Sequence, residues 1–239
     1  MGEVKKKDIP ELGSIVQRDR ETYAIVPHLP AGVTDVNGLK KIAEVAEKYG
    51  AQAIKVTSAQ RIAIVGIKEE DLEAAWEELG MEKGQAIGKV VRSVKVCPGT
   101  TFCRVGLQDA VGMGMELDKL YHGMELPWKF KIGVSGCPNS CSESWVKDIG
   151  LIGSKNGYKI VVGGNSGKKA RVADELFAEK SVDETKQIVK DLLEVYKETA
   201  NKAERFSAFI ERVGLDNLKY YLEEEDEAKK EKIKESFRP

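Results

Sequence analysis

Two close pairs of cysteines constrain this 239-residue chain more than any other feature. Cys97 and Cys103 are separated by five residues, and Cys137 and Cys141 by three. In a cytosolic chain, cysteines in close pairs are more often metal ligands or catalysts than a disulfide framework. The spacing differs from that of zinc ribbons and bacterial ferredoxins. The pattern predicts a metal centre, with four unrelated thiols as the alternative.

Both pairs stand among residues that favour tight turns. In the segment 136–141, Gly136 allows unusual backbone angles, and Pro138 fixes φ and removes an amide donor. We expect this turn to open a helix, whose N-terminal amides and dipole favour thiolates. The first pair spans a loop that also contains proline and glycine. Four thiolates on two loops suit a cubane iron–sulfur cluster, with structural zinc as the alternative.

Charge and hydropathy argue against several classes of partner. The 38 Lys and Arg residues nearly balance the 39 Asp and Glu residues, so the electrostatic footprint of a nucleic-acid binder is missing. The longest apolar runs, such as 62–67, fall far short of the ~20 residues that a membrane helix needs. The first residues contain no apolar stretch typical of a signal peptide. We therefore expect a cytoplasmic protein without a nucleic-acid or membrane partner.

Hydrophobic periodicity divides the chain near a glycine-punctuated link at 84–88. Before this link, the pattern predicts the order β-α-β-β-α, most of a ferredoxin-like split unit. The expected elements are strands at 22–27, 53–57 and 61–67 and helices at 36–49 and 69–79. After the link, we expect strands at 92–96, 128–134, 149–152 and 158–162, and helices at 106–121, 182–212 and 216–222. The charged segment 223–235 indicates a solvated, frayed end.

The cysteine pattern and its flanks resemble a known family. The segments VRSVKVCPGTTFC and KIGVSGCPNSC are similar to those of sulfite and nitrite reductases, which couple siroheme to a [4Fe-4S] cluster. The resemblance extends from Gln17 to Gly214. It implies an α+β protein with a ferredoxin-like half domain over 1–86, an α/β siroheme- and cluster-binding domain over 87–180, and a helical extension over 181–239. In this family the last cysteine also bridges to the siroheme iron, and by position that residue is Cys141.

Three basic residues are candidates for binding an oxyanion. Lys129 and Lys131 stand at i and i+2 on an expected strand, so both side chains leave one face. Two solvated lysines on an amphipathic strand are the alternative. The family has a similar Leu-Pro-x-Lys-x-Lys segment, and Arg92 matches a family arginine near the substrate. The resemblance implies that these residues bind sulfite or nitrite, stabilise developing negative charge and relay protons.

One departure from the family concerns the segment 58–61. Larger members carry Thr-Arg-Gln there, whereas this chain has Ser-Ala-Gln followed by Arg61. Arg61 lies two residues beyond the missing arginine and would share its face in a strand, with a surface residue as the alternative. Siroheme carries eight carboxylates, which require basic residues around it. The resemblance places these residues near the macrocycle: Lys55, Thr57, Gln60, Asn139, Gly163, Gly164 and Arg171.

The resemblance implies a six-electron reduction of sulfite to sulfide. The sequence has no G-x-G-x-x-G fingerprint, so electrons must come from a ferredoxin-like donor or a redox subunit. Nitrite reduction to ammonia, an iron–sulfur electron carrier without siroheme and a zinc-stabilised interaction module are the alternatives. Larger family members contain two copies of this unit, and we therefore expect a homodimer.

Overall fold

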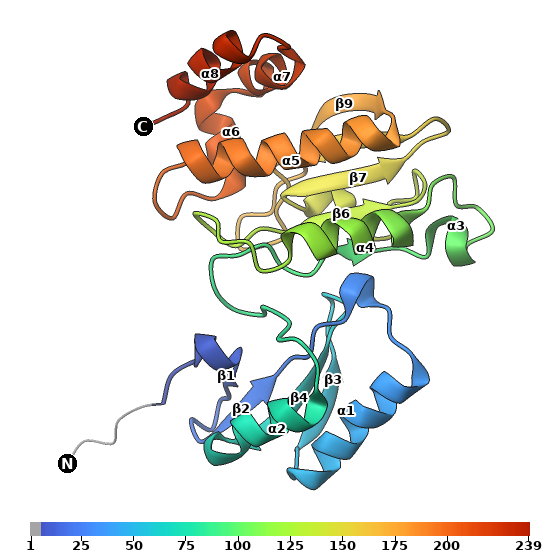
Figure 1. Ribbon diagram of the computed structural model, residues 1–239, viewed down its shortest axis with the longest axis vertical. Helices are drawn as coiled ribbons and strands as arrows, with labels where there is room; N and C mark the ends of the chain where they lie inside the picture. Colours follow the sequence, from blue (N-terminus) through green and yellow to red (C-terminus); the bar gives the residue numbers. More distant parts are fainter. Residues whose placement is uncertain (1–5) are drawn as a thin grey trace. The chain divides into compact units, whose positions relative to one another are not determined.

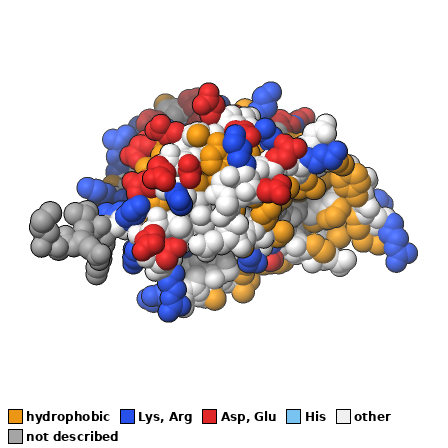
Figure 2. All heavy atoms as spheres, turned by 90° about the horizontal axis from the view of Figure 1, so that it is seen from below, with side chains coloured by type: hydrophobic (Ala, Val, Ile, Leu, Met, Phe, Trp, Pro, Cys, Tyr) orange, Lys and Arg blue, Asp and Glu red, His pale blue; other side chains and the backbone are white. Residues whose placement is uncertain are grey.

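The computed structural model describes residues 6–239, and the chain divides into two compact units, Met1–Gly88 and Lys89–Pro239 (Figure 1). We predicted domain boundaries after residues 86 and 180, and residues 181–239 belong to the second unit. None of the helices within residues 6–239 has the length and apolar character needed to cross a bilayer. On the face seen in Figure 2, acidic and basic side chains are interspersed, in keeping with the balanced charge.

The N-terminal unit contains an antiparallel sheet with strand order β1-β2-β4-β3. Its strands are β1 (Ile15–Val16), β2 (Thr22–Ile25), β3 (Ala53–Val56) and β4 (Ile62–Lys68). Its helices are α1 (Val36–Lys48) and α2 (Leu72–Leu79). These elements confirm the predicted β-α-β-β-α order. Strand β1 was not predicted, because two residues are too few to show a periodicity.

Capping and burial explain the two helices of this unit. The Asp35 side chain accepts a hydrogen bond from the Gly38 amide at the start of α1, and Gly80 ends α2 at φ 59°. Apolar residues of both helices pack against β2 and β4 in one core. Its members include Tyr23, Ile25, Ile42, Val45, Ile64, Ile67, Leu72 and Trp76.

The C-terminal unit is built on a five-stranded sheet with strand order β5-β6-β7-β8-β9. The strands are β5 (Lys95–Val96), β6 (Ile132–Ser135), β7 (Ile149–Gly153), β8 (Tyr158–Val162) and β9 (Asp174–Lys180). The strands β5, β6 and β7 are parallel, and β8 and β9 continue the sheet antiparallel. Strand β9 was not predicted, and β5 is shorter than the expected strand at 92–96.

The two faces of this sheet differ in the size of their side chains. The register aligns Val134, Leu151 and Ile160 on one face, which the helices α4 (Ala110–Tyr121) and α5 (Val182–Thr199) cover (Figure 1). Gly133 and Gly150 pair on the other face. Side chains at consecutive strand residues point to opposite faces. The small residues therefore leave room for a chain segment that crosses the sheet.

The predicted helix over 182–212 is wrong, because the structure breaks it into α5 and α6 (Phe206–Val213). Ala200 adopts extended angles after α5, and Ala203 has a positive φ of 63°. The Glu204 side chain then accepts a hydrogen bond from the Asn201 amide at 2.8 Å. This turn folds α6 back, so that its aromatic residues pack on α5. The cluster consists of Phe130, Tyr196, Phe206 and Phe209.

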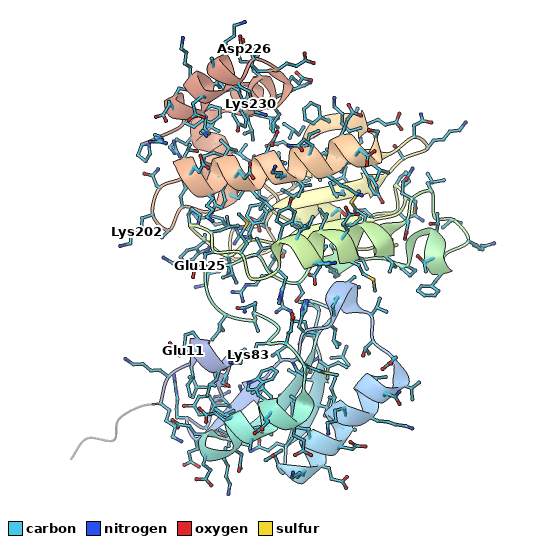
Figure 3. The ribbon with its side chains drawn as sticks, viewed as in Figure 1. Glu11, Lys83, Glu125, Lys202, Asp226 and Lys230 are labelled. Atoms are coloured by element: carbon cyan, nitrogen blue, oxygen red, sulfur yellow. The ribbon has the colours of Figure 1, made fainter. Side chains whose placement is uncertain are left out.

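The predicted frayed end is also wrong. Residues after α7 (Leu215–Glu223) form a further helix, α8 (Glu227–Ser236), which Asp226 caps through the amides of two residues (Figure 3). Lys230 on α8 pairs with Asp191 on α5 at 3.0 Å. Phe237 is 3% exposed and packs against aromatic rings of α6 and α7. A charged sequence is therefore held in place by ion pairs and one buried ring.

Candidate metal centre

The structure brings the two cysteine segments together at the ends of neighbouring parallel strands. Cys97 directly follows β5, and the turn with Cys137 and Cys141 follows β6. The Cys97 amide donates to the Val134 carbonyl at 3.1 Å, and the Gly136 amide donates to Cys97 Sγ at 3.0 Å. Such N–H···S contacts stabilise a thiolate.

The four sulfurs differ in exposure. Cys97 and Cys137 are buried, each 8% exposed. Cys103 ends the short helix α3 (Gly99–Phe102) and is half-buried, whereas Cys141 is exposed. Protein therefore surrounds most of Cys97, Cys103 and Cys137, whereas Cys141 is accessible to a further group.

Glycines allow the two cysteine loops to touch through their backbones. Gly99 has a φ of 53°, and a Cβ added at Gly136 would lie 2.8 Å from the Gly99 Cα. On the other side, a Cβ at Gly153 of β7 would lie 2.4 Å from the Gly136 carbonyl oxygen. No side chain fits at these distances, so the three glycines form a close-packed stack. The stack fixes the separation of the loops that carry the cysteines.

The prediction that the second cysteine turn opens a helix is wrong. The segment after Cys137 forms successive turns, and only the short 3-10 helix η4 (Ser144–Val146) follows. Ser140 and Glu143 have positive φ values of 51° and 60°, which a regular helix excludes. The segment is instead held by turn hydrogen bonds, such as the one that the Glu143 amide donates to the Ser140 carbonyl at 2.8 Å.

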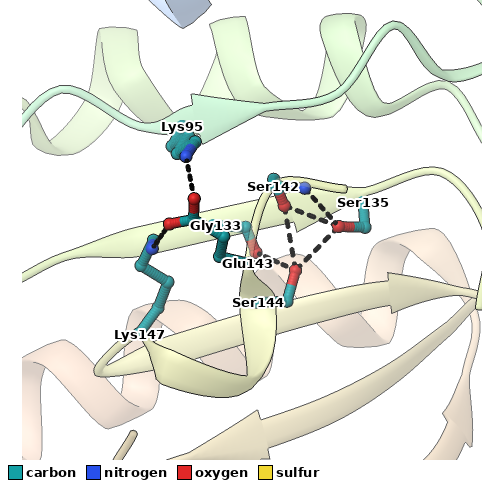
Figure 4. Close-up of polar contacts among 7 residues, drawn as sticks. All are labelled: Lys95, Gly133, Ser135, Ser142, Glu143, Ser144 and Lys147. Carbon is teal, nitrogen blue, oxygen red and sulfur yellow. Dashed lines mark hydrogen bonds and ion pairs between the residues drawn. The ribbon is translucent and has the colours of Figure 1, made fainter. Parts of the chain in front are cut away.

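Three buried serine hydroxyls hold this turn on the sheet (Figure 4). Ser135 Oγ lies 2.6 Å from Ser142 Oγ and 3.0 Å from Ser144 Oγ, and the last two are 3.0 Å apart. Ser144 also reaches the carbonyls of Gly133 and Leu151 in the strands β6 and β7. A fully satisfied buried network of this kind favours a single loop conformation.

An ion pair links the two cysteine segments from outside. Glu143 accepts from Lys95 at 2.9 Å and from Lys147 at 3.0 Å (Figure 4). Hydrogen bonds from the two lysines lower the pKa of Glu143. Lys95 stands two residues before Cys97, and Glu143 stands two residues after Cys141. The carboxylate therefore ties both thiol loops together and offsets part of the local positive charge.

The residues present fit an iron–sulfur cluster. Ser140 Oγ, between Cys137 and Cys141, is buried without a hydrogen-bond partner among the described residues. Cluster sulfides would give this hydroxyl an acceptor. Four thiols on two rigid loops are the ligands such a cluster needs.

The three predicted oxyanion residues lie on two adjacent extended segments. The Arg92 amide donates to the Phe130 carbonyl at 2.9 Å, and Phe130 forms a parallel bridge with Val91. Val91 and Phe130 are both fully buried. Because side chains alternate in extended chain, Arg92, Lys129 and Lys131 leave on the opposite side. Lys131 directly precedes β6, and Lys129 lies outside any strand, so the predicted strand at 128–134 begins later than expected.

Lys131 stands in a basic environment. It is half-buried, and burial is the main cause that lowers its pKa, followed by the charge of Lys147. Asp148 acts in the opposite direction, while Lys129 and Arg205 lower the pKa further. Basic groups at this density favour an anion and make Lys131 a better proton donor than an ordinary lysine.

The candidates of the N-terminal unit lie in and beside the β3–β4 turn. Lys55 is exposed on β3. The Thr57 hydroxyl donates to the Arg61 carbonyl at 3.1 Å and accepts from the Arg61 amide at 3.2 Å. Gln60 adopts a φ of 57° in this turn. Arg61 is 7% exposed and precedes β4, so it lies in the turn instead of the expected strand.

The remaining candidates belong to the C-terminal unit. Asn139 is exposed in the second cysteine turn, and Gly163 and Gly164 are buried after β8. Arg171 donates to the Gly163 carbonyl at 2.9 Å and pairs with Asp174 at 2.5 Å. Arg171 therefore holds the loop that follows β8.

Sequence reasoning missed the groups that position the site. The serine network and the lysines that pair with Glu143 carry no recognised spacing. The density of small polar residues in 135–144 was the only available signal. Asp148, which is fully buried beside Lys131, carried no signal at all.

The C-terminal unit thus carries four thiols on two adjoining loops after β5 and β6, and three basic residues on the extended segments that precede these strands. Comparison with family models matches residues 87–230 to the nitrite and sulphite reductase 4Fe-4S domain and residues 15–82 to the nitrite/sulfite reductase ferredoxin-like half domain. The chain therefore belongs to the nitrite and sulfite reductase family. This result confirms the resemblance and the α+β fold class.

Individual relatives agree with this assignment. The chain is 44% identical over 207 residues to an assimilatory-type sulfite reductase of Nitratidesulfovibrio vulgaris, which covers 87% of this chain and 95% of the relative. It is also 44% identical over 207 residues to a Bacillus subtilis nitrite reductase [NAD(P)H], covering 87% of this chain but 26% of that protein. The crystal structure of dissimilatory sulfite reductase I superimposes with a TM-score of 0.73 at 17% identity, covering 82% of this chain and 68% of that one, which shows the shared fold.

Proposed function

We propose that this chain reduces sulfite to sulfide with electrons from an external donor. The observation that carries the proposal is the near end-to-end match to a sulfite reductase, 44% identical over 95% of that protein's length. The four thiols and the three basic residues of the C-terminal unit support it. Neither an iron–sulfur carrier nor a zinc module needs a basic site of this kind.

The residues divide into those that hold cofactors and those that act on the anion. When bound, siroheme and a [4Fe-4S] cluster would pass the six electrons of the external donor on to the anion. The four cysteines would hold the cluster, and Cys141, whose exposure leaves it accessible to a further group, would serve the siroheme iron as well. By the family pattern, the residues that would surround the macrocycle are Lys55, Thr57, Gln60, Asn139, Gly163, Gly164 and Arg171.

The basic residues bind the oxyanion and move its protons. Each oxygen of sulfite leaves as water, so three oxygens consume six protons. Arg92 stays charged throughout and holds the anion, whereas a lysine can release a proton and regain one. The lowered pKa of Lys131 favours this release, because its neutral form costs less than in an exposed lysine. We assign Lys131 as the principal proton donor and Lys129 and Arg92 as the anion contacts, with Arg61 as a further candidate.

Lys129→Ala and Lys131→Ala should each lower kcat/KM for sulfite by about ten- to a hundredfold. A charge-assisted contact to an anion contributes about 1.5–3 kcal/mol, and the loss falls on the transition state. The free energy of unfolding should change little, because neither side chain is fully buried. Steady-state kinetics with a chemical reductant measures the effect. Lys202→Ala, at an exposed lysine of the same unit, is the control and should leave the kinetics unchanged. Unchanged kinetics in the Lys129→Ala/Lys131→Ala variant would contradict the assignment.

Nitrite reduction to ammonia is the second candidate, since the nitrite reductase of Bacillus subtilis matches with the same identity. The match covers 26% of that nitrite reductase but 95% of the sulfite reductase, and for this reason we place sulfite first. Competition between the two anions in one assay decides the order. A larger kcat/KM for nitrite would reverse it.

We further propose a ferredoxin-like donor or redox subunit and a homodimer. The donor follows from the absence of a dinucleotide fingerprint in the sequence. For the dimer, we expect a mass near twice 26.4 kDa by light scattering. Mixing Cys141→Ser with Lys129→Ala/Lys131→Ala chains should restore part of the activity if the basic face of one copy serves the centre of the other. A monomeric mass or no complementation would refute the shared site.

A further inference from the structure

A buried carboxylate lies behind the lysine that we assign as proton donor. Asp148 is fully buried, and its Oδ2 accepts a hydrogen bond from the Lys131 amide at 2.9 Å. The Ile149 amide, next along the chain, donates to the Lys131 carbonyl at 3.2 Å. Two consecutive residues at the start of β7, Asp148 and Ile149, therefore hold the amide and the carbonyl of Lys131.

The C-terminal helices supply the group that faces this carboxylate. Arg205, at the N-terminus of α6, places Nη2 3.5 Å from Asp148 Oδ1. The Gly163 amide donates to the Asp148 carbonyl at 2.8 Å, which fixes the residue from the side of β8. The aromatic ring of Phe206, directly after Arg205, packs on Phe130, directly before Lys131. The segments that carry Lys131 and Arg205 are therefore anchored in the same aromatic cluster.

A charge at Asp148 acts on the Lys131 side chain as well as on its backbone. The charged groups that influence Lys131 are Lys147, Asp148, Lys129 and Arg205. Among them Asp148 is the only acid, and it is the only one that favours the ammonium form. Burial raises the pKa of Asp148 itself to about 6, against the opposing charges of Arg205 and Lys131. Above that pH the carboxylate is charged and supports a charged Lys131.

We propose that Asp148, held by Arg205, is the positioning residue that keeps Lys131 in place and in its charged form. The inference rests on the proposed function for its catalytic meaning, but the contacts it uses are independent of the reaction. After a proton has left Lys131, the buried carboxylate makes regaining one favourable. Without the charge of Asp148, the neighbouring Lys129, Lys147 and Arg205 would leave Lys131 neutral over more of the working pH range.

The direct test measures the charge state of Lys131 without using turnover. In the holoenzyme, acetic anhydride is applied in trace amounts across pH 5–10, and mass spectrometry reads the acetylation of the Lys131 peptide. In Asp148→Asn, which keeps an oxygen for the Lys131 amide but removes the charge, the reactivity curve should move to lower pH. At pH 8 we expect roughly three- to tenfold faster acetylation than in the wild type. At pH 5, where the wild-type carboxyl is protonated, the two proteins should behave alike.

Two further variants separate charge from structure. Asp191→Asn makes the same change at a nearly buried aspartate that pairs with Lys230 on α8, and it should leave the Lys131 curve in place. Asp148→Glu keeps the charge and should return the curve toward that of the wild type. An unchanged curve in Asp148→Asn, or equal curves for Asp148→Asn and Asp148→Glu, would overturn the proposal.

A reciprocal experiment covers the case in which Asp148→Asn does not fold. Because the pKa of Asp148 is raised from 3.8 to about 6 on folding, the folded protein binds its proton more tightly, and stability from this group falls as pH rises through that window. Lys131→Met removes a charge that lowers the Asp148 pKa. The fall in stability should therefore extend to higher pH than in the wild type, as measured by denaturant unfolding from pH 4 to 8. Superimposable pH profiles would refute the coupling.

The kinetic readout distinguishes failure of the inference from failure of the function. If sulfite is the substrate, the alkaline limb of kcat/KM should move to lower pH in Asp148→Asn, in step with the acetylation curve. A shifted acetylation curve with no reductase activity in any protein would refute the proposed function and leave the positioning role standing. A shifted kinetic limb with an unchanged acetylation curve would refute the positioning role.

Discussion

In Cys141→Ser, the cluster signal and the siroheme signal should be lost together, and sulfite turnover should fall below detection. The reason is that one sulfur is proposed to serve both groups, and a serine hydroxyl is a far weaker ligand for iron than a thiolate. Cys141 is exposed, so the loss does not arise from disruption of a core. Absorption and electron paramagnetic resonance spectra, together with iron and sulfide analysis, measure both groups in one preparation.

Cys97→Ser provides the matched comparison. Cys97 is buried and accepts a hydrogen bond from the Gly136 amide, and in the proposed site it would serve the cluster alone. This variant should lose cluster iron first and retain more siroheme than Cys141→Ser. Siroheme that keeps a thiolate ligand in Cys141→Ser would show that another residue is axial.

The second large effect concerns a residue without a side chain. Gly153→Ala should lower the free energy of unfolding by about 3 kcal/mol and reduce the bound iron per chain. The added Cβ would lie 2.4 Å from the Gly136 carbonyl oxygen and 3.0 Å from the Cys137 amide nitrogen. Both are backbone atoms, so relief requires the cysteine turn to move away from β7. Chemical denaturation and metal analysis give the two quantities.

Gly167→Ala is the control for that change. A Cβ at this position would meet only the Asn165 side chain, at 3.1 Å or more, and a side chain can move aside. Its stability and iron content should stay near the wild-type values. If Gly153→Ala also keeps wild-type iron content, then the glycine stack does not set the geometry of the cysteine loops.

The fold could be predicted where periodicity and turn chemistry agree. The N-terminal β-α-β-β-α order followed from alternating strands, and the glycines after α1 and α2 stand where those helices end. The family assignment followed from the cysteine spacing together with both flanking segments. These signals are local, so a single sequence carries them.

The errors share a different origin, because tertiary contacts decided each outcome. The charged segment after Glu223 looked solvated, yet the ion pair of Lys230 with Asp191 on α5 and the burial of Phe237 hold its helix against the rest of the unit. The cysteine turn does not open a helix, since Ser140 and Glu143 adopt left-handed angles that contacts with the sheet support. Asp148 could not be singled out, because its role depends on neighbours that lie 17 and 57 residues away in the sequence.

The parallel arrangement of β5 and β6 has a consequence for how the protein matures. Cys97 meets Cys137 only after the chain between them has formed the crossover that includes α4. Closing a loop of this length costs entropy before any strand contact compensates it, so parallel pairing forms late in folding. The four thiols are consequently scattered in the nascent chain and gathered in the folded one. The four thiols can therefore serve the proposed cluster together only in a chain that has formed this crossover.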